Sequence, residues 1–489
     1  MNSRLYQLVW IPVVILGINF FIRLIDQSQI IFTFPLDYAN DISSDLARVF
    51  FLAKCGLHNY CPYWYGGFIA FKGFSLGWSL FTLPLYLLTK NILVATYISI
   101  ILIYIISLIF LFTLGKIERF SNLTTIAFFV FIFGNAIAIG NFIKLGRIES
   151  LFAYMLFLGL ALLIFYYKNH RIDKKFFLFF IPLYTMILIS HQQEMILSQI
   201  LIFCLFLIKD HKDKIKIIIG ALSGFLISSF WTVPFIINLR NVRELEIQSG
   251  WLLSFSKANL LTNIASILIP LVLIILLYLY WISKNKSKRE FIFFLPVLII
   301  SILFLSRIII FLPILRNISP DPYLMFFLFF IVFLFFKTDL GKYRTLSIFL
   351  LMLASILSVT ISIAHTPYFI SHSNHDKEII SLLPKIEGKF IMISTPPDSY
   401  SFAYYSYAAI YYNLSTPDGW YRHMVDKEYI GDIDSMYFSF LNRDCNGFLT
   451  YLKKIGGEEV IGYLDDCKLL YQCGLKEKIK KDQVCLFTL

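Results

Sequence analysis

The chain has 489 residues, of which 58% are hydrophobic, 18% aromatic and only 15% charged. This composition excludes a soluble globular protein, because apolar runs of about 20 residues, the length of a membrane-crossing helix, recur from Leu8 to Ala364. The net charge of +12 does not indicate nucleic-acid binding, because most basic residues lie in short loops between apolar runs, where they set membrane orientation.

The apolar runs predict about eleven transmembrane helices within residues 1–364. The predicted spans are Leu8–Ile25, Ile92–Leu114, Leu123–Asn141, Ser150–Tyr167, Phe176–Ser190, Met195–Ile208, Ile215–Leu239, Leu260–Trp281, Phe291–Phe311, Tyr323–Phe336 and Leu346–Ala364. A loop of residues 26–91 follows the first span. The fold class is therefore an α-helical polytopic membrane protein.

One apolar segment of this loop, Phe74–Leu88, is short and contains Gly77 and Pro84. If it does not cross the membrane, five basic loops share the side of Arg4, as the positive-inside rule requires; if it crosses, all five lie outside. These loops are Lys116–Arg119, Lys168–Lys175, Lys209–Lys216, Lys284–Arg289 and Lys337–Arg344. We therefore predict a re-entrant or interfacial helix at residues 74–88 on the outer face. The N-terminus is then cytoplasmic and the C-terminal domain extracytoplasmic.

Residues 365–489 have ordinary polarity and predict a small α/β domain. The predicted strands are Phe390–Ser394, Val460–Leu464 and Val484–Thr488, and the predicted helices are Ser401–Tyr412 and Phe448–Ile455. A turn is expected at Thr395–Asp398.

Six of the seven cysteines lie on the predicted outer side, which permits disulfides. Cys55 and Cys61 flank a loop short enough for a bridge, and we predict that they pair. Cys467–Cys473 is a weaker candidate, with Cys445 and Cys485 as the competing pair. Free thiols packed as small apolar residues are the alternative.

Ionisable residues gather at the outer ends of the predicted spans. The first loop carries Asp37, Asp41 and Asp45, and later positions add Lys144, Arg147, Glu149, His191, Glu194, Arg307 and Arg316. Charges near a bilayer are costly to desolvate, which favours a functional site. The alternatives are a solvated external loop, a polar turn that caps a helix, and arginine side chains that extend to water.

Two further patterns are less specific. Three tryptophans could stack on sugar rings, although interfacial belts also use tryptophan; they are Trp64, Trp78 and Trp251. Three histidines near an acid have a spacing that matches no standard metal-ligand frame, so we interpret them as part of a solvated linker; they are His365, His372 and His375, beside Asp376.

The first-loop motif Asp41–Arg48, followed by Trp64–Gly67, resembles the "6-pyruvoyl-tetrahydropterin synthase-related" membrane domain family, whose members resemble GT-C-fold glycosyltransferases. The family pattern has an acid, a histidine four residues on, then a tryptophan and a Gly-Gly pair. Asp45 stands here where the histidine is usual. Gly146–Glu149 resembles the second acidic loop of the wider GT-C group, which includes oligosaccharyltransferases and protein O-mannosyltransferases. Two further motifs resemble the terminal domain of the same family: Gly419–Tyr421 and Glu459–Tyr463.

The resemblance implies transfer of a sugar from a polyprenyl-phosphate carrier to a glycan, lipid or protein acceptor at the outer membrane face. Asp41 would be the general base, with Asp45 and Glu149 as further catalytic acids. Basic side chains would stabilise the leaving phosphate; they are Lys144, Arg147, Arg307 and Arg316. Glu149 would position either the acceptor or a divalent cation, and the sequence leaves both open. Trp64, His191 and Glu194 complete the predicted substrate site.

We further predict that Asp41 and Glu149 face one cavity that opens to the outer leaflet, roofed by the 74–88 helix and the terminal domain, with at least one of the site arginines lining it. Two other classes of protein stay open. A transporter or lipid flippase would carry ionisable residues at mid-membrane, whereas here they cluster at the outer ends. A non-catalytic envelope protein that binds glycans would keep the aromatic residues without needing the acids.

Overall fold

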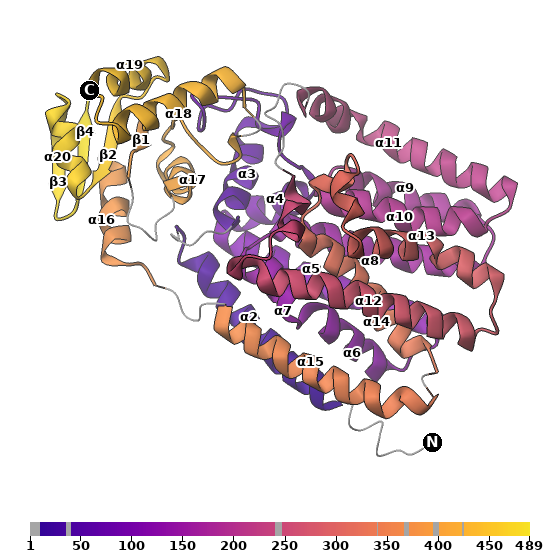
Figure 1. Ribbon diagram of the computed structural model, residues 1–489. Coiled ribbons are helices and arrows are strands. Elements are labelled where there is room, and N and C mark those ends of the chain that lie inside the picture. The colour runs from indigo at the N-terminus through magenta and orange to yellow at the C-terminus, as the bar shows by residue number, and fades with distance from the viewer. Residues whose placement is uncertain are drawn as a thin grey trace. The chain divides into compact units, whose positions relative to one another are not determined.

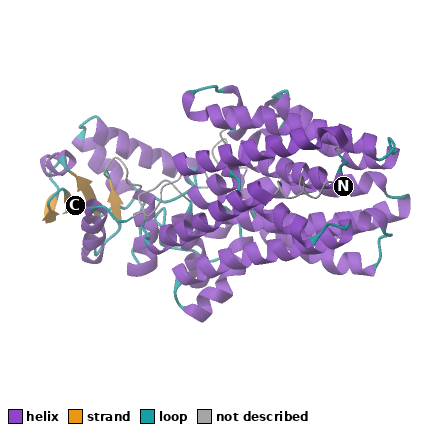
Figure 2. Cartoon of the chain, turned by 90° about the horizontal axis from the view of Figure 1, so that it is seen from below, coloured by secondary structure: helices purple, strands orange, loops and turns teal. Residues whose placement is uncertain are grey.

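The structure is a computed structural model that describes residues 10–35, 41–239, 247–339, 341–365, 371–394, 401–422 and 425–489. Helices dominate, and the strands form a small sheet near the C-terminus (Figure 1, Figure 2). The chain folds as two compact units. Unit 1 comprises Met1–Gln27, Ile100–Thr232 and Leu245–Pro367, and unit 2 comprises Ser28–Ser99, Val233–Glu244 and Tyr368–Leu489. The first loop therefore belongs to the same unit as the C-terminal residues.

Unit 1 is a bundle of long helices. They are α2 (Trp10–Phe32), α5 (Ile92–Glu118), α6 (Asn122–Phe133), α8 (Ile148–Asn169), α9 (Lys174–Leu188), α10 (Gln192–Ile208), α11 (His211–Leu239), α12 (Leu260–Ser283), α13 (Lys288–Leu305), α14 (Pro320–Lys337) and α15 (Arg344–His365), of which α2, α5 and α11 extend into unit 2. α8 packs against α9 and α10, α10 against α13, and α12 against α13 and α14.

Short helical turns join several of these helices at their ends. They are α7 (Ala136–Ala138), the π-helix η2 (Ile139–Lys144), and the 3₁₀ turns η3 (Gln248–Leu253), η4 (Lys257–Asn259), η5 (Ile308–Phe311), η6 (Leu315–Asn317) and η7 (Gly341–Tyr343). The turns η3, η5 and η6 pack against one another.

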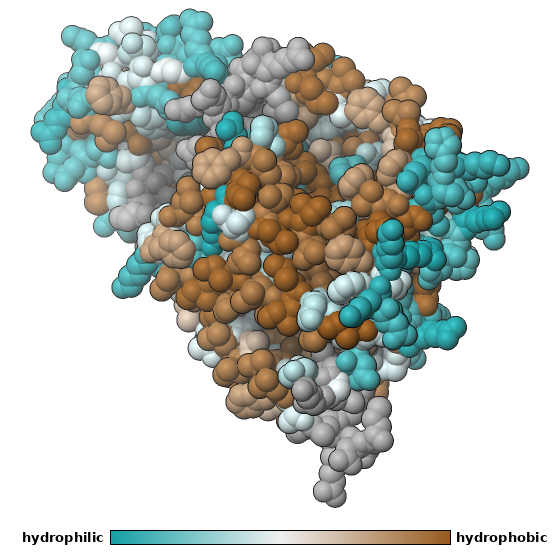
Figure 3. Space-filling view, turned by 45° about the vertical axis from the view of Figure 1, so that its right-hand side comes forward, coloured by the Kyte–Doolittle hydropathy of each residue, from teal (hydrophilic) through white to brown (hydrophobic). Residues whose placement is uncertain are grey.

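The surface of the bundle is apolar, as in a protein surrounded by lipid. Figure 3 shows a face on which hydrophobic residues form a broad area bordered by hydrophilic ones. α8 is almost wholly enclosed by its neighbours, whereas α11, α12 and α15 expose many large aliphatic side chains. An apolar exterior of this extent would aggregate in water and fits a membrane protein.

Within the described residues, seven helices are long and apolar enough to cross a membrane, or eight if a bent pair counts as one span. The predicted number of about eleven is therefore not confirmed. The bent pair replaces the predicted span Leu123–Asn141: α6 ends at Phe133, and the chain turns by 48° before Ala136–Lys144. Three other predicted spans correspond to helices that do not pass as spans.

These three helices are short or charged for identifiable reasons. α9 has 15 residues and α10 has 17, because the chain turns between Ile189 and His191. α13 has 18 residues, but Lys288, Arg289 and Glu290 occupy its first turn. Hydropathy measures how apolar a run is and does not report where the backbone leaves the helix, so adjoining short helices read as full spans.

A buried polar network holds α2 in the bundle. Arg23 and Asp26 form an ion pair with an Nη1–Oδ2 distance of 3.0 Å, and both side chains are buried. Arg23 also donates from Nη2 to the Ser362 carbonyl of α15 at 2.7 Å. Gln27 donates to the carbonyl of Phe142 in η2 at 3.1 Å. The network thus connects α2 to two other elements of unit 1, since buried charges require such partners.

Replacement of Asp26 by alanine should destabilise unit 1 by about 3–5 kcal/mol, because the Arg23 guanidinium would lose its charge partner in an apolar environment. The melting temperature of the detergent-purified chain measures the effect. Ile25→Ala is the control, since Ile25 is 56% exposed on the same helix turn. Equal melting of the two variants would show that the ion pair contributes no net stability.

Unit 2 contains the predicted α/β domain. Its helices and turns are α3 (Ile42–Cys55), η1 (Ala70–Lys72), α4 (Gly77–Thr89), α16 (Asn374–Leu382), η8 (Leu383–Lys385), α17 (Ser401–Tyr412), α18 (Lys427–Leu441), α19 (Cys445–Lys454) and α20 (Asp465–Gln472). Its strands are β1 (Phe390–Met392), β2 (Glu459–Tyr463), β3 (Lys476–Lys481) and β4 (Val484–Thr488). The sheet order is β1-β2-β4-β3, with β1 and β2 parallel and the other pairs antiparallel.

The predicted strands and helices of this domain are confirmed, with small differences at their ends. The predicted turn Thr395–Asp398 lies outside the described residues. The helix predicted at residues 74–88 corresponds to α4, whose 13 residues extend over about 20 Å, less than the roughly 30 Å core of a bilayer. The length of α4 fits a helix that does not span, and the membrane topology itself stays a prediction.

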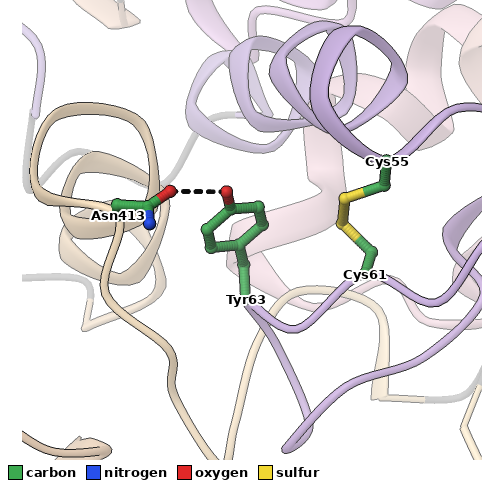
Figure 4. Close-up of a disulfide and its surroundings, with 4 residues drawn as sticks. All are labelled: Cys55, Cys61, Tyr63 and Asn413. Atoms are coloured by element: carbon green, nitrogen blue, oxygen red, sulfur yellow. Dashed lines mark hydrogen bonds between the residues drawn. A yellow bond between two sulfur atoms is a disulfide. The ribbon is translucent and has the colours of Figure 1, made fainter.

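Three disulfides brace unit 2. Cys55–Cys61 joins the end of α3 to the following loop, with the Cα atoms 5.4 Å apart (Figure 4). This pair confirms the prediction. The weaker candidate Cys467–Cys473 is wrong: the pairs are Cys445–Cys473 and Cys467–Cys485. Cys485 lies in β4, beside α20, so Cys467 is carried toward the sheet and not toward the end of its own helix. Cys204 in unit 1 is a buried free thiol.

The first loop packs against the C-terminal residues inside unit 2. The Thr416 amide donates to the Tyr63 carbonyl at 2.8 Å, and the Tyr63 hydroxyl donates to Asn413 at 2.6 Å (Figure 4). The Trp64 ring lies so close to Gly419 that a Cβ there would be 2.7–2.9 Å from three Trp64 atoms. The motifs Trp64–Gly67 and Gly419–Tyr421, which are far apart in the sequence, are therefore parts of one packed core.

The Gly-Gly pair of the first loop serves this packing. Gly66 and Gly67 both have positive φ angles, of 65° and 119°, a region that side chains disfavour. A Cβ on Gly67 would lie 1.7 Å from the Tyr60 hydroxyl oxygen. The tight turn brings the Gly66 amide to the Thr416 carbonyl at 3.1 Å. Glycine is required here for close approach, independently of any catalytic role.

Candidate active site

In unit 1, the predicted site residues lie where helices α8, α10 and α14 begin. Arg147 is the N-cap of α8, and its Nη1 donates to Asn141 Oδ1 at 2.9 Å. The same nitrogen is 3.5 Å from Asp321 Oδ2 in the first turn of α14. One arginine thus connects the end of η2 with the starts of two helices. We call this set the helix-start cluster; it comprises Asn141, Arg147, Glu149, Ser150, His191, Glu194 and Asp321.

Two glutamates and a histidine complete the helix-start cluster. His191 Nδ1 pairs with Glu194, and the Ser150 hydroxyl donates to the other oxygen of the same carboxylate. Burial lowers the pKa of His191, but the Glu194 carboxylate, assisted by Glu149, outweighs this effect and leaves the pKa raised. Glu149 is buried in the first turn of α8. The electrostatic effect on His191 places the Glu149 charge near this pair.

The three acids of the cluster each have a structural role at the start of a helix. Glu149, Glu194 and Asp321 each occupy the first turn of a helix. The unpaired N–H groups and partial positive charge of a helix start favour a carboxylate there. Each carboxylate thus faces the partial positive charge of its own helix start, and Arg147 adds a full positive charge beside Asp321.

Three more predicted cations belong to unit 1. Lys144 is half-buried in η2, three residues before Arg147. Arg307 is half-buried and has a positive φ of 64° at the start of η5. Its Nη2 donates to Ser266 at 2.8 Å, while its Nη1 is buried without a hydrogen-bond partner among the described residues. Arg316 is exposed in η6, and its carbonyl accepts a hydrogen bond from Ser249.

In unit 2, the first-loop acids Asp41 and Asp45 lie at the start of α3. Asp41 is half-buried at the N-cap position, and its carbonyl accepts hydrogen bonds from the amides of Ser44 and Asp45. The Asp41 side chain does not cap the helix. Asp45 is buried and forms an ion pair with Arg48, one helix turn on, at 2.9 Å. Asp37 lies outside the described residues.

Sequence reasoning did not select Arg48 or Tyr421 as site residues, although both stand inside quoted motifs. The Arg48 guanidinium donates to the Tyr421 hydroxyl at 2.8 Å and lies over the rings of Tyr421 and Phe74, 4.9 and 5.3 Å from their centroids. The Ser44 hydroxyl is 3.2 Å from the same tyrosine oxygen. The polar side of α3, beside Asp41, is therefore connected to the Gly419–Tyr421 motif. The spacing of an arginine three residues after an acid could have identified the Asp45–Arg48 pair, but no local pattern marks the contact with Tyr421.

Trp64, predicted to bind sugar, is fully buried. Its ring stacks in parallel with Phe68 and meets Phe51 edge-on, besides packing against Gly419. The ring is therefore part of the core of unit 2, and we assign it to packing. Asp45 likewise belongs to an internal ion pair. The predicted meeting of Asp41 with Glu149 joins residues of different units and stays a prediction.

No protein-family model and no curated protein sequence matches the chain. Its fold is similar to that of solved membrane glycosyltransferases. The archaeal oligosaccharyltransferase AglB from Archaeoglobus fulgidus, in complex with an inhibitory peptide and a dolichol-phosphate, is 8% identical with a TM-score of 0.59; the match covers 96% of this chain and 71% of that one. The Archaeoglobus fulgidus enzyme in complex with Zn and sulfate is 10% identical with a TM-score of 0.59, over 92% and 68% of the two chains.

The arabinofuranosyltransferase AftD from Mycobacteria is 11% identical with a TM-score of 0.62, over 98% of this chain but 39% of that one. These neighbours have the GT-C fold, so the chain has a GT-C-like membrane fold with a small C-terminal sheet. Identities this low establish the fold alone. The resemblance to the 6-pyruvoyl-tetrahydropterin synthase-related family stays an interpretation of the motifs.

The His191–Glu194 pair makes a pH-dependent contribution to stability. Because the pKa of His191 is raised in the folded chain, the stabilisation is fully present below the unfolded value of about 6.5 and is lost as the pH rises through the folded value. The difference in melting temperature between wild type and His191→Gln should therefore be largest at acidic pH and shrink above neutrality. His58→Gln, which changes an exposed loop histidine, should show no such trend. A pH-independent difference for His191→Gln would contradict the pairing.

Proposed function

We propose that this protein is a membrane glycosyltransferase that transfers a sugar from a polyprenyl-phosphate-linked donor to an acceptor on the extracytoplasmic face. The observation that carries the proposal is the likeness to membrane glycosyltransferases over 96% and 98% of the chain. One of these neighbours was solved with a dolichol-phosphate and a peptide. Since a fold supports several functions, the reaction is argued from the residues.

Asp41 is the proposed general base. In the reaction, the Asp41 carboxylate takes the proton of an acceptor hydroxyl, and the hydroxyl oxygen attacks the anomeric carbon of the donor sugar. The bond between that carbon and the phosphate oxygen breaks, and polyprenyl phosphate leaves with the electron pair. The position of Asp41 supports this role, because it is a half-buried carboxylate at the start of a helix. General bases act best in a defined, partly desolvated position.

The leaving phosphate requires cations, and unit 1 supplies them. Arg307 is the strongest candidate, because its buried Nη1 has no hydrogen-bond partner among the described residues while Ser266 holds the other side of the guanidinium. A guanidinium held in this way can donate to phosphate oxygens without first breaking an internal ion pair. Lys144, Arg147 and Arg316 are the further proposed contacts. Glu149 and the His191–Glu194 pair are proposed to position substrate.

A divalent cation was an open possibility for Glu149. Within the described part of the chain, no group of three or more His, Cys, Asp or Glu side chains is arranged to hold a metal ion. The described residues thus provide no such ligand set, and the divalent cation that the sequence leaves open for Glu149 stays open. The membrane orientation, with the N-terminus cytoplasmic and the C-terminal residues outside, belongs to the same proposal.

Asp41→Asn should lower the transfer rate by about 10²–10⁴-fold while leaving carrier binding largely intact, because the amide keeps the shape of the carboxylate but cannot accept the proton. Release of labelled sugar from a set of polyprenyl-phosphate monosaccharides by the nanodisc-reconstituted chain measures the rate. Asp465→Asn is the control, since Asp465 is exposed on α20. Wild-type turnover of none of these donors, or an active Asp41→Asn variant, would overturn the assignment.

Arg307→Ala should instead weaken binding of polyprenyl phosphate by about 10-fold or more, because charge-assisted hydrogen bonds contribute about 1.5–3 kcal/mol. Titration of the nanodisc-reconstituted chain with fluorescent polyprenyl phosphate gives the dissociation constant. Arg119→Ala removes an exposed arginine from the same unit and should not change it. Unchanged affinity of Arg307→Ala would remove Arg307 from the phosphate site.

A further inference from the structure

Unit 2 contains a cavity that the proposed reaction does not use. It has a volume of about 430 Å³, within the range of small-molecule sites, about 300–1,000 Å³. It lies at the carboxyl end of β1, beside Met392 and Ser394, and Arg422 and the α18 side chains Asp434 and Phe438 form its opposite wall. Crevices at the carboxyl ends of parallel strands are a usual place for ligands in α/β folds.

The polar part of the cavity wall contains charged side chains, but their net charge is not positive. Arg422 donates from Nε to Asp418 Oδ1 at 2.9 Å and pairs through Nη2 with the other oxygen of that buried carboxylate. Its Nη1 donates to Asp434 at 3.0 Å. Two carboxylates thus neutralise one guanidinium, which makes the cavity unsuitable for a phosphate or another anion. A neutral ligand with several hydroxyl groups can donate to Asp434 and accept from Arg422.

The α18 wall of the cavity also has an apolar, exposed part. Phe438 is 69% exposed and Leu441, one turn later on α18, is 79% exposed. The Tyr437 hydroxyl donates to the Met392 carbonyl at 3.1 Å, and the Arg422 guanidinium lies 5.3 Å from its ring centroid. Tyr437 is thus held at the cavity edge, and the exposed Phe438 ring beside it can pack against the apolar face of a sugar ring. Asp434 and Phe438 are four residues apart on α18 and therefore share one helix face. A carboxylate beside an exposed phenyl ring can bind a hydroxyl group and the apolar face of the same pyranose ring.

The outer edge of β1 is not available to a peptide that would bind by adding a strand to the sheet. On that edge the Phe390 amide donates to the Ser415 carbonyl at 3.4 Å, and the Met392 amide donates to the Tyr405 hydroxyl at 2.9 Å. The Met392 carbonyl accepts from Tyr437. Both outward amides and the Met392 carbonyl, which strand addition would need, are thus already bonded within unit 2. Recognition in this cavity therefore depends on side chains.

We infer that this cavity binds a saccharide, and that the acceptor of the proposed transfer is a glycan. The identification of the saccharide as the acceptor rests on the proposed function. The binding of a saccharide in this cavity does not depend on catalysis. Asp434 and Arg422 would contact the hydroxyl groups, and Phe438 would stack on the apolar ring face. The proposal thus takes the glycan from the three acceptor classes that the sequence leaves open.

Saturation-transfer NMR of the full chain in nanodiscs tests the inference with free disaccharides of mannose, glucose, galactose, arabinose and N-acetylglucosamine. At least one disaccharide should bind to wild type, and Phe438→Ala should weaken its binding about 3–10-fold, the effect of losing one aromatic contact. Asp434→Asn should weaken it as well. Tyr471→Ala is the matched control, because Tyr471 is 68% exposed on α20, away from the cavity, and it should bind like wild type.

The outcomes separate this inference from the proposed function. Asp41→Asn should bind the disaccharide with wild-type affinity. If the wild-type chain binds the disaccharide but transfers no sugar, the glycan site is supported and the proposed reaction is wrong. Where transfer is observed, Phe438→Ala should raise the KM for the glycan acceptor, and Tyr471→Ala should leave that KM unchanged. Binding of no disaccharide, equal loss in Tyr471→Ala, or preferential binding of hydroxyl-containing hexapeptides would overturn the inference.

Discussion

The contact between the Trp64 ring and Gly419 determines how unit 2 is built. The ring is fully buried and fills the space that any side chain at position 419 would occupy. Because the indole is held there, the Gly66 amide reaches the Thr416 carbonyl and the Tyr65 hydroxyl reaches the Trp420 carbonyl. The position of Tyr421 follows, and with it the contact to Arg48 beside Asp41. The geometry around the proposed base thus depends on a packing contact between segments more than 350 positions apart in sequence.

Unit 1 follows a different rule, in which charge is placed where helices start. Glu149, Glu194 and Asp321 satisfy the electrostatic demand of three helix N-termini, and Arg147 connects two of these starts. Arg307 is the exception, since its guanidinium is held by a serine hydroxyl and the face of Phe304. A cation supported by neutral groups retains more of its field for a ligand than one paired with a carboxylate. This contrast is why Arg307 carries the phosphate part of the proposal.

The sequence predicted three strands and two helices of the C-terminal domain, because these segments carry clear patterns, but α16, α18 and α20 were missed. The interpretation of His375 and Asp376 as part of a solvated linker is wrong, because both lie in α16 and Asp376 is buried. Val484–Thr488 coincides with β4 and Ser401–Tyr412 with α17. β3 was missed because Lys476–Lys481 has a single apolar residue and is exposed along an edge of the sheet, so no hydrophobic alternation marks it. The number of spans was overestimated because hydropathy does not register the turn before His191 or the break after Phe133. In the candidate site, residue type and position identified the charged groups, but the burial of Trp64 and Asp45 depends on contacts with distant segments that no local pattern contains.

The three disulfides all belong to unit 2, whereas the thiol of unit 1 is buried and unpaired. The two units therefore mature by different chemistry. The described helices of unit 1 contain no disulfide, while unit 2 needs oxidising conditions to close its cross-links, the longest of which joins residues 28 positions apart. A chain produced under reducing conditions would insert its helices and still lack the covalent frame around the first loop. Yield judged by membrane insertion would then overstate the amount of correctly matured protein.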